Sequence, residues 1–463
     1  MSRTNDFTEG KILSPLLRFA LPVLAALFLQ AMYGAVDLWV VGKFAETADI
    51  SAVSTGSQIM HSITGFLVGL STGITVLVAQ KIGEKRPDDA GKAIGNGITL
   101  FAVLAVIFTV LMLSFTPQIS KLMNAPEKAF SQTVDYVRIC SAGTVFIIAY
   151  NVLGSVFRGI GDSKMPLITV SIACVINIAG DLILVKVFGM GAAGAAYATV
   201  GAQAISVFLS LIVISKRKLP FEFGKKCMRF DFSVCGRILR IGSPIAFQDA
   251  LVSISFLVIF SIVNSLGLVA SAGVGVAEKL CAFVMLVPSA YSQSMSAFVG
   301  QNIGARKPDR AKKALFCGIA SSLVAGVFMG YLSFFHGDML SLIFAKDPEV
   351  IAAAASYLKA YAIDCLFTSF LFCFIGFYSG LGKTVFVMVQ GVIGAFCVRV
   401  PVSYFVSKIP DVPLFYIGLA TPASTVLQII MCFAFFAFVN KEFKNLYSKS
   451  LDNDILDCYN LNK

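Results

Sequence analysis

LSPLLRFALPVLAALFLQAMYGAVDLWVVG, residues 13–42, is the stretch that decides the fold class of this chain. It is longer than the roughly 20 apolar residues that cross a bilayer as a helix, yet it contains Pro22 and Asp37. An ionisable side chain inside the lipid costs about 3 kcal/mol or more, so Asp37 is expected to face a partner or a water-filled cavity. Pro22 removes a backbone hydrogen bond and is expected to act as a hinge. Alternatively, Asp37 lies near the water interface and Pro22 only kinks a packed helix.

The composition is that of a polytopic membrane protein. Of the 463 residues, 57% are hydrophobic and 14% are charged, with a mean hydropathy of +0.82. A soluble protein cannot bury that much apolar surface. The net charge of +11 lies in loops between apolar runs, so it does not indicate nucleic-acid binding. The 11 cysteines form no C-x-x-C pair and the two histidines are isolated, so we expect no disulfides and no cofactor.

Twelve apolar runs follow one another, and each is long enough to span a bilayer. The loops between them, taken alternately, assign 27 of the 37 Lys and Arg residues to the side that holds both termini and eight to the other side. By the positive-inside rule, both termini are cytoplasmic, and we expect an all-α multi-pass protein of the inner cell membrane. The expected spans are 13–42, 50–80, 93–116, 133–157, 165–188, 192–215, 238–266, 270–300, 314–336, 352–379, 384–407 and 413–440.

An internal repeat divides these spans into two bundles of six. AQKIGEKRPDDAGKA at 79–93 recurs as GQNIGARKPDRAKKA at 300–314, and the same offset in numbering, 221, also pairs Gly159 with Gly380. Because each bundle holds an even number of spans, both start on the same side, and a pseudo-two-fold axis along the membrane normal relates them. The expected domains are an N-terminal lobe (1–218), a basic cytoplasmic linker (219–237), a C-terminal lobe (238–440) and a cytoplasmic tail (441–463).

Polar residues gather at one depth in the N-terminal lobe. Asn177 and Asp181 share a helical face, and Asp181 lies about 24 Å from the cytoplasmic end of its span. Asp37 and Thr199 lie at a similar depth in their own spans, and Tyr33 stands one turn below Asp37. Such an all-oxygen group suits Na⁺, and two desolvated carboxylates side by side could instead exchange protons near neutral pH. Alternatively, these groups only form hydrogen bonds between helices.

The C-terminal lobe does not repeat the acidic pair. The positions that match Asp37 and Asp181 at the offset of the repeat are Val258 and Val402, which are apolar. This lobe has charges of its own within the spans, and because they nearly balance we expect a paired structural or gating network. The residues of this network are Asp249, Glu278, Lys279, Asp364 and Arg399.

Five sequence features together resemble landmarks of the multidrug and toxic compound extrusion (MATE) family. They are FALPVLAALFLQAMYGAVDLWVVGKF at 19–44, the pattern Q-x-I-G-x-x-x-P-x-x-A in both halves, FRGIGDSKMP at 157–166, NIAGDLILV at 177–185 and YSGLGKT at 378–384. The acids in the first half resemble those of the DinF-like branch of the family. Asp249 and Asp364 lie near the places where the other branch has acids, but they are offset from them.

The resemblance implies an antiporter coupled to H⁺ or Na⁺ that exports small organic, cationic and amphipathic compounds by alternating access. It also implies that the first helix bends at Pro22. The remaining roles follow from the same family pattern. It assigns the coupling ion to Asp37, Asn177, Asp181 and Thr199, and substrate contact or proton relay to Tyr33 and Asn151. We expect the protein to work as a monomer in the bilayer.

Two other functions fit a chain of this composition less well. A flippase of lipid-linked precursors, from the same superfamily, would need a wide cationic cavity, whereas the N-terminal lobe is acidic. A membrane enzyme such as a prenyltransferase would need a DDxxD-like metal site within the membrane. The adjacent acids Asp88 and Asp89 lie instead in a basic loop without a second cluster. A channel is disfavoured because no stretch resembles a repeated filter. We therefore expect a transporter and not an enzyme.

Overall fold

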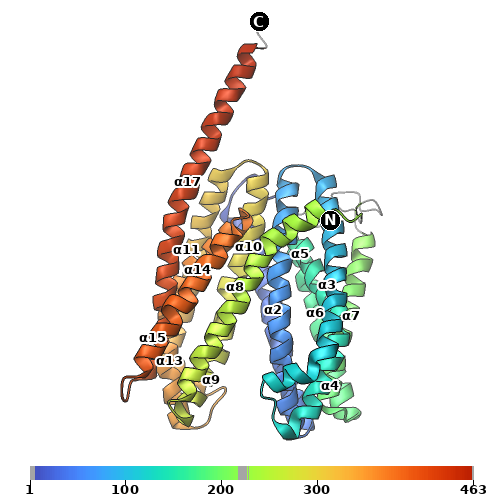
Figure 1. The fold of residues 1–463 in the computed structure, drawn as a ribbon, viewed down its shortest axis with the longest axis vertical. Coiled ribbons are helices and arrows are strands. Elements are labelled where there is room, and N and C mark those ends of the chain that lie inside the picture. The colour runs from blue at the N-terminus through green and yellow to red at the C-terminus, as the bar shows by residue number, and fades with distance from the viewer. Residues whose placement is uncertain (1–5, 217–226, 228, 461–463) are drawn as a thin grey trace.

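The computed structural model describes residues 6–216, 227 and 229–460, with side chains as far as residue 443. Over these residues the chain forms helices and no strand. Eleven helices are long and apolar enough to cross a membrane, and a bent pair makes the twelfth span. The prediction of an all-α protein with twelve spans in two bundles is confirmed (Figure 1).

The N-terminal lobe, or N-lobe, contains the first six spans. Its helices are α1 (Leu13–Phe44), α2 (Thr47–Gly83), α3 (Pro87–Leu122), η1 (Glu127–Ala129), α4 (Phe130–Ala142), α5 (Thr144–Gly159), α6 (Lys164–Asp181), the π-helical segment η2 (Leu182–Val187) and α7 (Gly191–Lys216). The fourth span is the bent one, with an angle of 53° between its two helices. The bend is at Gly143, where a Cβ would overlap the Val200 side chain of α7. The sequence did not predict it, because one glycine in an apolar run does not by itself end a helix.

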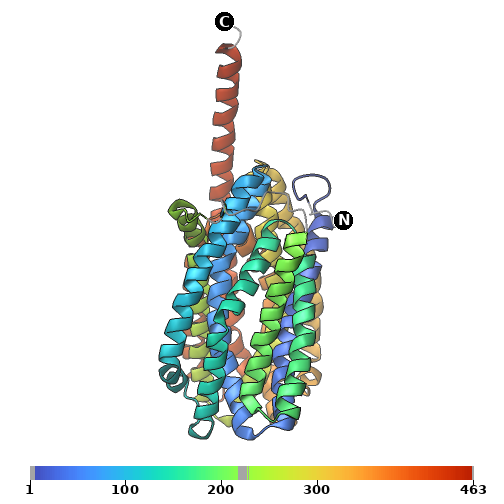
Figure 2. The same ribbon diagram turned by 90° about the vertical axis from the view of Figure 1, so that its right-hand side faces the viewer.

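The C-terminal lobe, or C-lobe, contains the other six spans. Its helices are α8 (Phe232–Asn264), α9 (Leu268–Val284), α10 (Leu286–Gly304), α11 (Pro308–Phe335), α12 (Gly337–Ser341), α13 (Pro348–Gly380), α14 (Thr384–Ile393), the π-helical segment η4 (Gly394–Arg399), α15 (Val400–Ser407), α16 (Leu414–Gly418) and α17 (Ala420–Asn460). Residues 219–226 and 228 of the predicted linker lie outside the described residues, and α8 begins at Phe232, earlier than expected. The predicted tail continues the last span, because α17 extends beyond the bundle as one helix (Figures 1 and 2).

The loops after α2, α5, α10 and α13 lie at one end of the molecule, which we call the terminal face. The repeat is visible in their backbone. Lys85 and Arg306, which are equivalent positions of the repeat, both end a helix in the left-handed region, with φ of 56° and 55°. A proline then begins the next helix in each case.

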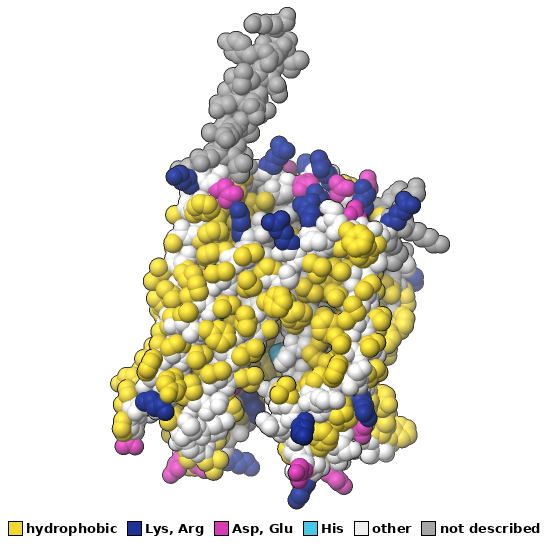
Figure 3. All heavy atoms as spheres, in the orientation of Figure 1, with side chains coloured by type: hydrophobic (Ala, Val, Ile, Leu, Met, Phe, Trp, Pro, Cys, Tyr) yellow, Lys and Arg dark blue, Asp and Glu magenta, His cyan; other side chains and the backbone are white. Residues whose placement is uncertain are grey.

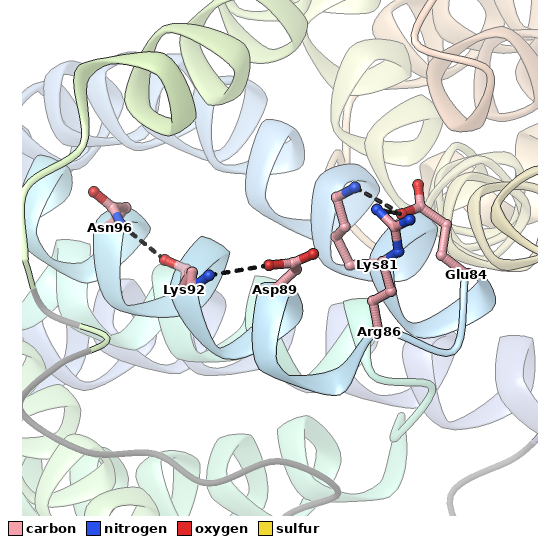
Figure 4. A network of polar contacts seen from close by, with 6 residues as sticks. All are labelled: Lys81, Glu84, Arg86, Asp89, Lys92 and Asn96. Carbon is pink, nitrogen blue, oxygen red and sulfur yellow. Dashed lines mark hydrogen bonds and ion pairs between the residues drawn. The ribbon is translucent and has the colours of Figure 1, made fainter.

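Polar contacts hold the turn between α2 and α3 (Figure 4). Lys81 Nζ lies 2.7 Å from Glu84 Oε2, and Arg86 Nη1 lies 4.0 Å from the same oxygen. Lys92 Nζ lies 3.3 Å from Asp89 Oδ1. Partly exposed ion pairs of this kind contribute less than about 1 kcal/mol each. These ion pairs therefore order the turn but contribute little to stability. The bundle is stabilised by the apolar packing below the turn.

The first helix of each lobe crosses into the other lobe. Near the terminal face, Leu16 and Phe19 of α1 are buried in an apolar core built by α10, α11, α13 and α17. In the same way Ile238 and Ala246 of α8 are buried among α2, α3 and α5. Further along, each helix returns to its own lobe, as Val40 of α1 shows by packing within the N-lobe. The two lobes are thus tied together by two exchanged half-helices.

The lobes are closed against each other at the terminal face and parted at the opposite face (Figure 3). Gln80 Nε2 donates a hydrogen bond to the Gly380 carbonyl at 3.0 Å, and Gln301 Nε2 donates one to the Gly159 carbonyl at 3.3 Å. Because Gln80 matches Gln301 in the repeat, and Gly159 likewise matches Gly380, these two bonds are related by the pseudo-two-fold axis. We call this reciprocal contact the interlobe latch.

A segment before α1 is bound to the C-lobe at the same face. The Arg310 guanidinium donates to the carbonyls of Phe7 at 2.8 Å, Glu9 at 2.7 Å and Gly10 at 2.7 Å. The Phe7 ring is fully buried and packs against Phe19 and Phe298, with ring centroids 5.1 and 4.9 Å away. One arginine therefore orders the chain that leads into α1.

We expect Arg310→Ala to lower the free energy of unfolding by about 2 kcal/mol, because each lost hydrogen bond has a charged donor. The change would be measured as a lower thermal unfolding midpoint of the purified protein in detergent. Lys313→Ala is the matched control, since Lys313 is an exposed cation on the same helix. Equal shifts in the two variants would contradict a specific role of Arg310.

Candidate functional site

Three helices of the N-lobe bring the four predicted ion ligands together. Asp37 comes from α1, Asn177 and Asp181 from α6, and Thr199 from α7. Thr199 Oγ1 donates to Asp37 Oδ2 at 3.1 Å, and Asn177 Nδ2 lies 3.4 Å from Thr199 Oγ1. The Asp37 and Asp181 carboxyl groups are near enough to interact electrostatically. We call these four residues the N-lobe cluster.

The oxygen atoms of this cluster have too few hydrogen-bond donors around them. Asp37, Asn177 and Asp181 are 5%, 1% and 0% exposed. Asp37 Oδ1, Asn177 Oδ1 and both carboxylate oxygens of Asp181 have no hydrogen-bond partner among the described residues. Buried acceptors and buried charge without partners are costly, so the cluster as it stands is incomplete. A bound cation or added protons would complete it.

The backbone next to the cluster is also irregular. Asp181 is the last residue of α6, and the π-helical segment η2 follows it directly. π-Helical turns widen a helix locally and occur frequently at functional sites. Here the change of helix type starts at the side chain that has two unpaired oxygens. The sequence predicted the two acids but not this change of helix type.

The other predicted N-lobe residues lie around the cluster without completing it. Tyr33 is one turn before Asp37 and lies near the Gln203 side chain of α7. Asn151 donates to the Ile147 carbonyl of its own helix at 2.8 Å, so no described contact joins it to the cluster. Helix α1 continues through Pro22 as one helix.

The charges within the C-lobe spans are arranged differently from the expected network. Asp249, Asp364 and Arg399 line one cavity, whereas Glu278 and Lys279 lie on α9 outside it. None of the five forms an ion pair within 4.0 Å among the described residues. The expected pairing is therefore corrected. Near charge balance in a sequence does not bring side chains together when they come from four different helices.

This C-lobe cavity has a volume of about 320 Å³ and opens between the lobes. Its walls come from α2, α5, α8, α10, α13, η4 and α17. Sequence reasoning did not predict Arg158 or Gln248 as lining residues. The signal for Arg158 was a cation inside the motif FRGIGDSKMP, whereas a single glutamine on an apolar helix carries no such signal.

The MatE family profile matches residues 22–183 and 244–405, which are the first five spans of each lobe. The chain belongs to the MatE family. The two matches start at equivalent places in the two lobes, in agreement with the internal repeat. This MatE protein is a multi-pass membrane transporter and not an enzyme.

Known relatives cover nearly the whole of this MatE protein. It is 28% identical to the probable multidrug resistance protein YoeA of Bacillus subtilis (strain 168) over 92% of this chain and 93% of that protein. It is 26% identical to the probable multidrug resistance protein YpnP of the same strain, over 86% of this chain and 88% of that protein. A solved MOP superfamily transporter from Pyrococcus furiosus has the same fold, with a TM-score of 0.90 and 18% identity, over 96% of this chain and 100% of that chain.

Proposed function

We propose that this MatE protein is an antiporter of the inner cell membrane, coupled to H⁺ or Na⁺, that exports organic, cationic and amphipathic compounds by alternating access. It acts as a monomer, needs no cofactor and keeps both termini in the cytoplasm. The observation that carries the proposal is the N-lobe cluster, which has four buried oxygens without a donor. The names of the Bacillus subtilis relatives, which describe multidrug resistance, support export of foreign compounds.

The chemistry of the cluster suits a small cation. Two carboxylates, an amide oxygen and a hydroxyl are hard ligands of the kind that bind Na⁺, and two adjacent carboxylates can also take up protons. Either ion would relieve the repulsion between Asp37 and Asp181. Binding drives transport only if the two conformers have different affinities for the ion. Asp37 lies on α1, which crosses between the lobes, so a change at the cluster reaches the interlobe contact directly.

The charge distribution orients the molecule. Lys and Arg side chains gather at the terminal face, and the positive-inside rule assigns that face to the cytoplasm (Figure 3). The interlobe latch then closes the cytoplasmic side, and the parted lobes open to the outside. In this state the coupling ion enters from outside and the exported compound leaves.

Export from proteoliposomes with the Na⁺ and pH gradients imposed separately tests the proposal. We expect efflux of a fluorescent cationic dye to follow one of the two gradients and to stop when that gradient is collapsed. Vesicles without protein give the background. Efflux that is insensitive to both gradients would overturn the proposed coupling, and efflux no faster than background would overturn export itself.

A further inference from the structure

A buried guanidinium in the C-lobe cavity forms no ion pair within 4.0 Å among the described residues. Arg399 is 6% exposed, and its Nε has no hydrogen-bond partner among the described residues. Its Nη1 lies 3.4 Å from Ser255 Oγ, which is a long contact with a neutral group. The guanidinium carbon lies 4.4 Å from the centre of the Phe256 ring. The guanidinium therefore lies on an aromatic ring, and one of its N–H donors is unused among the described residues.

Such an arrangement is unusual for a structural arginine. A charged side chain is rarely buried without a partner of opposite charge, because the loss of hydration is large. The guanidinium group has five N–H donors in a planar fork that matches the two oxygens of a carboxylate or phosphate. Since Arg399 lines the cavity, an anionic group of a bound molecule can reach this fork.

The same cavity also holds unpaired negative charge. Asp364 is 2% exposed, and its Oδ1 has no partner among the described side chains and backbone. Asp249 lies opposite α2, next to Gly69, and its carboxylate is open to the cavity. Arg158, which donates to Ser155 Oγ at 2.9 Å, is the fourth charged lining residue. The formal charges of these two guanidinium groups and two carboxylates sum to zero.

This balance decides which ligand fits. A purely cationic molecule would be attracted by the carboxylates but would leave the buried Arg399 guanidinium unpaired. A purely anionic molecule would leave Asp364 unpaired for the same reason. A molecule with one group of each sign satisfies both, and the desolvation cost of each buried charge is then offset.

The fifth spans of the two lobes add a second observation. The fifth span of each lobe contains a π-helical segment with a buried charge at its edge. In the N-lobe Asp181 directly precedes η2, and in the C-lobe Arg399 ends η4. The offset of the repeat does not superpose these two segments, so what the lobes share is a π-helical turn beside a buried charge, which is negative in the N-lobe and positive in the C-lobe.

We propose that the C-lobe cavity binds amphoteric organic molecules, with a carboxylate or phosphate group on Arg399 and a cationic centre facing Asp364 and Asp249. The inference rests on the proposed function, because it names the substrate class of the exporter. It assigns Arg399 as the residue that selects for the acidic group. The Phe256 ring covers one side of the guanidinium, with its centre 4.4 Å from the guanidinium carbon.

Two dyes that differ in one functional group test this assignment. Rhodamine 110 has a cationic ring system and a free carboxylate, and rhodamine 123 is its methyl ester. Binding to the purified full-length protein in detergent would be measured by fluorescence anisotropy, without any ion gradient. We expect the wild type to bind rhodamine 110 with an affinity about ten times higher than that for rhodamine 123, or higher still. One charge-assisted hydrogen bond contributes a difference in affinity of this size.

Variants separate recognition from a structural role. Arg399→Gln is expected to remove the preference by weakening rhodamine 110 binding, with rhodamine 123 binding unchanged or stronger. Arg399→Lys is expected to restore part of the preference. Arg237→Gln, which changes an exposed arginine on α8, is the control and should keep the wild-type ratio.

Three results would overturn the assignment. These are equal binding of the two dyes by the wild type, equal weakening of both by Arg399→Gln, and tighter binding of the ester. If Arg399→Gln does not yield folded protein, the wild-type comparison of the two dyes still decides the question. If the acid is preferred but no dye is exported from proteoliposomes, the proposed antiport fails and the binding site stands.

Discussion

The double variant Asp37→Asn with Asp181→Asn is expected to lose ion-driven export, down to the rate of vesicles without protein. Both carboxylates belong to the N-lobe cluster, and between them they provide three of its four unpaired oxygens. Asparagine keeps the size of each side chain but removes the negative charge. A cation then gains little from binding, so the imposed gradient no longer favours one conformer over the other.

The measurement is dye efflux from proteoliposomes at matched protein content, under whichever gradient drives the wild type. Asp88→Asn is the control, since it removes one exposed carboxylate at the terminal face and should leave efflux unchanged. If the driving ion is Na⁺, it should also raise the thermal unfolding midpoint of the wild type and not that of the double variant, because only a protein with a site is stabilised by mass action. Normal efflux by the double variant would remove the N-lobe cluster from the mechanism.

The double variant Gly83→Ala with Gly304→Ala is expected to prevent closure at the terminal face and to slow export by about tenfold or more. A Cβ at Gly83 would overlap the Gln301 carbonyl oxygen, and a Cβ at Gly304 would overlap that of Gln80. Both obstacles are backbone atoms of the other lobe, which cannot rotate away as a flexible side chain can. The helices α2 and α10 must therefore separate, and the interlobe latch is weakened with them.

Closure would be followed as the distance between spin labels on the α2–α3 and α10–α11 loops. We expect the short-distance population of the wild type to be depleted in the double variant. Gly65→Ala, on the same helix α2, is the matched control, because nothing lies within 4 Å of its Cβ position. That control should keep the wild-type distances and gain slightly in stability, since alanine favours the helix over glycine. Wild-type distances in the double variant would show that the latch tolerates a methyl group.

The number of spans, the repeat and the depth of the polar residues were predictable from the sequence. Each depends on a property that is local to one helix: its apolar length, its loop motif, or the constant rise per residue along its axis. For this reason Asp37, Asn177, Asp181 and Thr199 were predicted at a common depth, and the structure brings them together.

What the sequence could not determine is how each helix is rotated and which neighbours it has. In a membrane, helices pack by shape and by polar contacts between chain segments that are distant in sequence, and hydrophobic periodicity says little about either. The expected ion pairs among the C-lobe charges do not form within 4.0 Å among the described residues for this reason, and Arg399 lies on the ring of Phe256. No sequence pattern predicted that α1 and α8 cross between the lobes.

The sequence by itself thus determined a twelve-span membrane protein with a repeated loop motif and two acids in only one of its halves. The tertiary structure alone decided which oxygens remain without a donor, which face is closed and where Arg399 points. The physical reason is that the length of a span and the depth of a residue within it depend on one helix alone. The partners of a buried charge come from three or four helices, and only packing sets how those helices are rotated.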